Sequence, residues 1–180
     1  MTVNELFGKQ MTAPRLILKL GVEALFVWNF WKYSTEYATT SQDPPWECFS
    51  TGYRQPNAAG DGDNISEAFT ELCWAGFYLS VIALVIGVVE LVNKFAKVKQ
   101  LTIVVNIADS LMVLAAAAWL VWCYTVRLSQ GGKICAGATT NVTGPTRPYA
   151  YEQGSMLVTL MVIGTIMPVT LFVATNCGCL

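Results

Sequence analysis

Four apolar stretches of membrane-spanning length are the feature that most constrains the fold of this 180-residue chain. A helix that crosses the hydrocarbon core of a bilayer needs about 20 predominantly apolar residues. Four segments meet that requirement: 14–34, 70–93, 100–126 and 155–176. The first is the least apolar, because Lys19 and Glu23 interrupt it. We predict an all-α integral membrane protein, a bundle of four transmembrane helices that forms one domain over residues 1–180.

Composition argues against a soluble enzyme and against a nucleic-acid-binding protein. Only 13% of the residues are charged, whereas about 25% is usual in soluble domains. The net charge of −1 leaves no basic surplus to neutralise a phosphate backbone. Histidine is absent, which removes the usual general base and the commonest metal ligand. We therefore predict a non-enzymatic protein without catalytic residues, metal site, cofactor or nucleic-acid partner.

Lysine and arginine in short loops predict the orientation of the spans. Lys9 and Arg15 precede or open the first span, and three lysines lie in the short loop 94–99. Because short cytoplasmic loops carry an excess of basic residues, we expect both termini and this loop to be cytoplasmic. The loops 35–69 and 127–154 are then the two outer loops. A signal peptide is the alternative interpretation of the first segment, but no small-residue cleavage pattern follows it.

Two N-glycosylation sequons support this orientation. They begin at Asn64 and Asn141, one in each predicted outer loop, and such sequons are used on the lumenal side of the secretory route. We expect an integral membrane protein of the secretory route, in the plasma membrane or a vesicle membrane.

The six cysteines fall into groups once the orientation is assigned. Cys48 and Cys135 lie in the outer loops, and Cys73 and Cys123 lie near the outer ends of spans two and three. Disulfides persist in an oxidising lumen, and four cysteines allow three connectivities. We favour Cys48 with Cys135, which leaves the other two as buried small hydrophobes. Such a bridge either builds a cap for recognition or only limits loop entropy.

Two further cysteines, Cys177 and Cys179, follow the last span and are candidates for lipidation. Palmitoylation fits them better than prenylation, because the two middle positions of a prenylation motif beginning at Cys177 are Gly and Cys and not aliphatic residues.

Four ionisable residues lie inside the predicted spans, where charge is costly and marks a candidate functional site. At about 1.5 Å per residue, Lys19 and Glu90 lie about 7 and 6 Å from the cytoplasmic ends of their spans, and Glu23 and Asp109 both about 13 Å. An inward-facing arrangement would gather one cation and three carboxylates. We expect at least one carboxylate, Glu23 or Asp109, to be protonated or hydrogen-bonded to a neutral partner.

Asn106 and Ser110 are the candidate neutral partners in span three. The cluster has two interpretations: a polar clasp that fixes helix pairing, or a relay for protons or cations. We favour the clasp, because the chain lacks the internal repeat and broken helices typical of transporters.

Spans two and three resemble the MARVEL-type four-helix membrane proteins. This group includes synaptophysin, synaptogyrin, the myelin-and-lymphocyte proteins and, more distantly, the Casparian-strip membrane proteins. The resemblance rests on Asp109 early in span three, the alanine-rich and aromatic run 115–122 after it, and the basic loop 94–99. In the Casparian-strip branch a basic residue of span one accompanies that aspartate, a place that Arg15 or Lys19 fills. The resemblance implies a non-enzymatic membrane organiser.

We therefore predict a scaffold or an accessory subunit of a larger membrane assembly, such as a vesicle, a junction, or a channel or transporter complex. Its expected partners are membrane lipid, other integral membrane proteins at its lateral helix faces and outer loops, and a second copy of itself. The alternative is a small proton or cation transport component that uses the intramembrane carboxylates.

Overall fold

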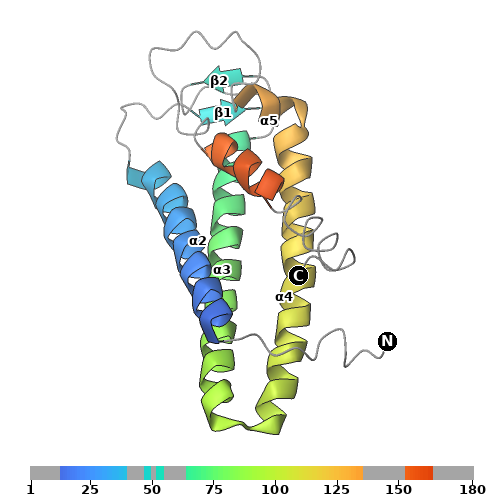
Figure 1. The fold of residues 1–180 in the computed structure, drawn as a ribbon. Coiled ribbons are helices and arrows are strands. Elements are labelled where there is room, and N and C mark those ends of the chain that lie inside the picture. The colour runs from blue at the N-terminus through green and yellow to red at the C-terminus, as the bar shows by residue number, and fades with distance from the viewer. Residues whose placement is uncertain (1–12, 40–46, 50–51, 55–63, 136–152, 164–180) are drawn as a thin grey trace. The chain divides into compact units, whose positions relative to one another are not determined.

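The structure, a computed structural model, describes residues 13–39, 47–49, 52–54, 64–135 and 153–163, which are almost entirely helical (Figure 1). The helices are α2 (Ala13–Thr39), α3 (Ile65–Ala96), α4 (Lys99–Leu128), α5 (Gln130–Cys135) and a further helix over Gln153–Ile163. Strands β1 (Glu47–Phe49) and β2 (Gly52–Arg54) form an antiparallel pair, with Cys48 opposite Tyr53.

The first three predicted spans are helical, as α2, α3 and α4. Among the described residues, α3 and α4 are the two helices that are both long and apolar enough to cross a membrane, with 32 and 30 residues. The 27-residue α2 is long enough for the roughly 20 residues that a span needs, but it carries Lys19 and Glu23. Of the predicted fourth span, 155–163 is helical, and the rest lies outside the described residues.

The predicted outer loops 35–69 and 127–154 are partly helical. α3 begins five residues before the predicted 70–93, because Asn64 caps it: the Asn64 side-chain oxygen accepts the Glu67 backbone N–H at 3.1 Å. Such an N-cap satisfies one of the donors that a helix start leaves unpaired. α2 continues to Thr39, since residues 35–39 contain no proline or glycine, and α5 lies within the second loop.

The turn between α3 and α4 is two residues long and is closed by Asn93. The Lys97 N–H donates to the Asn93 backbone oxygen at 2.7 Å, and Lys97 has a φ of 55°. The Asn93 side-chain oxygen accepts the Val98 N–H at 3.1 Å, and its side-chain nitrogen donates to the Thr102 hydroxyl at 2.8 Å. One buried asparagine therefore holds the end of α3, the turn and the first turn of α4.

The chain divides into two compact units, Met1–Lys32 with Trp74–Ala118, and Tyr33–Cys73 with Trp119–Leu180. In the first unit, α2 packs on α3 at two buried glycines. A Cβ placed on Gly76 would lie 2.5 Å from Cε1 of Phe30, and one on Gly87 would lie 2.8 Å from Cδ2 of Leu20. Both side chains lie directly over a glycine, so α2 contacts the α3 backbone at these two positions.

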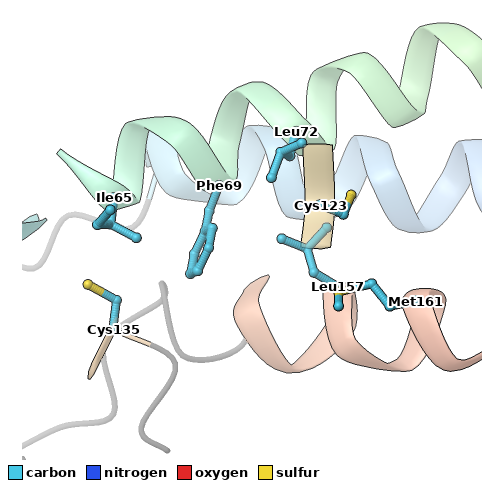
Figure 2. Close-up of a cluster of buried hydrophobic side chains, with 7 residues drawn as sticks. All are labelled: Ile65, Phe69, Leu72, Cys123, Cys135, Leu157 and Met161. Carbon is cyan, nitrogen blue, oxygen red and sulfur yellow. The ribbon is translucent and has the colours of Figure 1, made fainter. Parts of the chain in front are cut away.

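The second unit has its own apolar core. Figure 2 shows its side chains, which come from the start of α3, the last turns of α4, α5 and the helix Gln153–Ile163: Ile65, Phe69, Leu72, Cys123, Cys135, Leu157 and Met161. Side-chain donors to backbone oxygens reinforce this packing. The Trp119 indole N–H donates to Leu72 at 3.0 Å, and Arg127 Nε donates to Gly154 at 3.2 Å.

The structure shows whether three of the four candidate disulfide cysteines are bonded or free. Cys135 is disulfide-bonded, whereas Cys73 and Cys123 are free and buried. α5, which ends at Cys135, lies against β1, which contains Cys48, but the Cys48 side chain is outside the described residues. Pairing of Cys48 with Cys135 stays a prediction. Asn141, Cys177 and Cys179 also lie outside the described residues.

The glycine contact predicts a difference between two alanine substitutions on the paired helices. Gly76→Ala should lower the free energy of unfolding by about 1–3 kcal/mol, a usual range for overpacking, because Phe30 is only 4% exposed and has little room to move. Gly21→Ala is the matched control, since nothing lies within 4 Å of a Cβ there; it should stabilise α2 by up to about 1 kcal/mol. Thermal unfolding in detergent measures both, and equal melting temperatures would contradict the contact.

A second prediction concerns the cysteines. Peptide mapping without reductant should recover a Cys48–Cys135 cross-linked peptide. Under the same conditions, a small alkylating reagent should modify Cys73 and Cys123 only after unfolding, because both are 0% exposed. A cross-linked peptide containing Cys73 or Cys123 would contradict this pairing.

Candidate functional site

The candidate site is an ion-paired cluster in the first unit. The Lys19 ammonium on α2 donates a hydrogen bond to Oδ1 of Asp109 on α4 at 3.4 Å. The same Nζ lies 3.8 Å from Oε2 of Glu90 on α3. One cation therefore joins carboxylates from two other helices. We call Lys19, Glu90 and Asp109 the charge cluster.

Helix packing explains why Lys19 meets Glu90. Leu20 sits over Gly87, and Glu90 follows Gly87 by three residues, which is nearly one helical turn. Residues three apart on a helix share a face, so Glu90 lies on the face of α3 that α2 covers. The antiparallel run of the two helices then brings Lys19, the residue before Leu20, beside it.

The short turn at residues 97–98 returns α4 alongside α3 and supplies Asp109. Glu90 lies about 9 Å from the end of α3 at Ala96, and Asp109 about 15 Å from the start of α4 at Lys99, at 1.5 Å per residue. The two carboxylates therefore lie at different levels. The long lysine side chain reaches both of them.

The side chains of the charge cluster are partly shielded. Those of Lys19 and Glu90 are 24% and 25% exposed, and that of Asp109 is 39% exposed. Coulomb attraction strengthens as water is excluded, and an ion pair of this kind is the usual state for charge inside a membrane.

The structure corrects one part of the depth argument. Depth arithmetic places Lys19 with Glu90, and they do lie together, but it places Asp109 at the level of Glu23, whereas Asp109 bonds to Lys19. Glu23 is half-buried and lies on α2 one helical turn from Lys19, whose charge attracts it. The Ser110 hydroxyl donates to the Asn106 backbone oxygen at 2.9 Å. A protonated carboxyl, or one hydrogen-bonded to a neutral partner, stays a prediction for Glu23 and Asp109.

The chemistry of the charge cluster is that of a connector between helices. A lysine ammonium has three N–H donors and no acceptor, and here it lies between two acceptors. Within the described residues there is no group of three His, Cys, Asp or Glu side chains that could hold a metal ion. The arrangement offsets part of the negative charge of the two carboxylates and joins α2 to α3 and to α4.

Sequence reasoning missed residues that position this cluster. Gly76 and Gly87 determine how closely α2 approaches α3, and Asn93 determines how α4 returns. Small residues in apolar helices are a known sign of close helix packing, and that sign is present for both glycines. For Asn93, the sequence sign is an asparagine at the end of an apolar helix, four residues before a turn that contains no glycine.

No protein-family model, curated protein or solved structure matches the chain. The MARVEL-type resemblance therefore stays a prediction.

The geometry predicts energetic coupling between Lys19 and Asp109. Asp109→Asn and Lys19→Met should each lower the melting temperature. The double variant should lose less unfolding free energy than the sum of the two single losses. The difference, which is the coupling energy, should be about 1 kcal/mol, the range measured for polar contacts between membrane helices. Thermal unfolding of the four proteins in one detergent gives the coupling. Lys99→Met is the control and should not couple to Asp109→Asn, because Lys99 is exposed and lies about 15 Å from Asp109 along α4; strict additivity of the Lys19 and Asp109 changes would rule out the clasp.

Proposed function

We propose that this chain is an integral membrane protein of four helices with MARVEL-like architecture, acting as a scaffold or an accessory subunit of a larger membrane assembly. The single observation that carries the proposal is the Lys19 bridge to Glu90 and Asp109. It gives an intramembrane charge set a structural task that needs no substrate. The proposal includes both termini on the cytoplasmic side and residence in the plasma membrane or a vesicle membrane.

The exterior of α3 and α4 supports membrane insertion and lateral contacts. In the most apolar stretch of α4, only 6% is buried, and in that of α3 28% is buried. Monomeric soluble proteins rarely expose so large a contiguous apolar surface to water. The exposed large side chains of α4 in the first unit are Ile103, Val104, Ile107, Leu111, Val113 and Leu114. These side chains would contact lipid tails or the helices of another membrane protein.

The pairing of charges favours a clasp over a transport path. A relay requires carboxylates that bind and release a proton or cation in turn. Glu90 and Asp109 instead share a cation that belongs to the protein, and displacing it would leave Lys19 unpaired in an apolar environment, which is strongly unfavourable.

The same pair supports the family resemblance. The Casparian-strip branch implies a basic residue of span one that accompanies an aspartate of span three. Lys19 bonds to Asp109, and the Arg15 side chain lies outside the described residues. A shared intramembrane pair of this kind fits a non-enzymatic membrane organiser.

Purification of the tagged chain from its native membrane in mild detergent tests the proposal. We expect a stoichiometric complex with other integral membrane proteins or with further copies of the chain, seen by mass spectrometry and single-particle imaging. A photo-crosslinking residue at Leu114, which is 67% exposed, should capture that neighbour. The matched control at Leu72, which is 0% exposed, should capture none.

A monomeric particle without associated proteins would contradict the scaffold proposal. Reconstituted cation or proton flux that disappears in Glu23→Gln, Glu90→Gln and Asp109→Asn alike would replace it with transport.

A further inference from the structure

The turn between α3 and α4 concentrates positive charge at one end of the first unit. Lys94, Lys97 and Lys99 lie within six residues, and no Asp or Glu occurs between Glu90 and Asp109. Both of those carboxylates lie within 4 Å of the Lys19 ammonium. Residues 95–100 are all exposed. The turn is therefore a basic surface on a chain whose net charge is −1.

Lys97 occupies a backbone position that disfavours it. Its φ of 55° is in the left-handed region, where a side chain with a Cβ is strained and glycine is preferred after a helix. The Asn93 contacts that close the turn involve backbone atoms of Lys97 and Val98, and glycine would make them equally well. The hydrogen bonds of the turn therefore do not require a lysine, and the exposed Lys97 side chain is accessible to a group outside the protein.

Phe95 adds an apolar side chain to the same surface. It is 77% exposed, more than any other large hydrophobic side chain among the described residues, and Val98 beside it is 41% exposed. An aromatic ring next to lysines is typical of the boundary between lipid headgroups and acyl chains. There the ring enters the apolar layer and the ammonium groups reach the phosphates.

We propose that the turn 94–99 binds the phosphate groups of anionic phospholipids, with Lys97 as the central contact and Phe95 inserted beside it. The inference rests on the proposed function, because it takes α3 and α4 as membrane spans. A lipid fits better than a soluble polyanion, since a soluble partner would leave Phe95 in water. A basic residue near an anionic membrane surface raises association about fivefold.

The test uses the full chain reconstituted in phosphatidylcholine vesicles with trace spin-labelled lipid. The motionally restricted fraction of label gives the preference for phosphatidylserine over phosphatidylcholine at the protein boundary. Lys97→Gly should lower this preference about fivefold and should leave the melting temperature unchanged or raised, because glycine suits the φ of residue 97. The control Lys133→Gln removes an exposed lysine of α5 and should change the preference less than about twofold.

Insertion is measured first, by flotation with the vesicles after alkaline extraction. A wild-type chain that fails to insert overturns the proposed function and this inference together. A wild-type chain that inserts without preferring phosphatidylserine, or keeps its preference in Lys97→Gly, overturns this inference alone. Lys97→Asn, which also tolerates the left-handed region, replaces Lys97→Gly if that variant does not insert. In the wild type, 0.5 M salt should reduce the preference, because it screens exposed charges; a salt-independent preference would also overturn the inference.

Discussion

The close contact of α2 with α3 is the constraint on which the first unit depends. Gly76 and Gly87 leave space that Phe30 and Leu20 fill, so the contact determines both the distance and the register of the two helices. Lipid tails compete equally for apolar side chains, and helix pairs in membranes therefore depend on tight van der Waals contact and on polar bonds. Once Leu20 lies over Gly87, the position of Lys19 beside Glu90 follows.

The turn at Asn93 is the second determinant of the charge cluster. With only Lys97 and Val98 between α3 and α4, α4 must run back beside α3, and Asp109 reaches the ammonium that Glu90 already attracts. Glu90 and Asp109 lie 71 and 90 positions after Lys19 along the sequence. Their meeting depends on the glycine contacts of α3 with α2 and on the turn that Asn93 closes.

Regular helix geometry made part of this structure predictable. A rise of about 1.5 Å per residue was sufficient to place the helices of the first three spans and to match Lys19 with Glu90. It failed for Asp109, because a lysine side chain is long enough to reach a carboxylate at another level. The early start of α3 has a sign in the sequence, because Asn64 and Glu67 have the spacing of an N-cap pair. Asn64 also begins a glycosylation sequon, which favoured placing it in a loop. Which face of an apolar helix meets its neighbour cannot be deduced from composition alone, and the roles of Gly76 and Gly87 depend on that face.

The two units stabilise their helices with different chemistry, and the difference bears on function. In the second unit, Trp119, Arg127 and Gln153 donate to backbone oxygens, an acceptor that every residue offers. In the first unit Lys19 of α2 instead pairs with opposite charges on α3 and α4, which specifies a partner because a like charge in the same place is repelled. The first unit also carries the exposed apolar surface of α4. Because Glu90 and Asp109 both lie within ion-pair distance of Lys19, these two carboxylates are already engaged when that surface meets lipid or another protein. This fits the proposed lateral scaffold, whereas a conducting path would have to break these ion pairs.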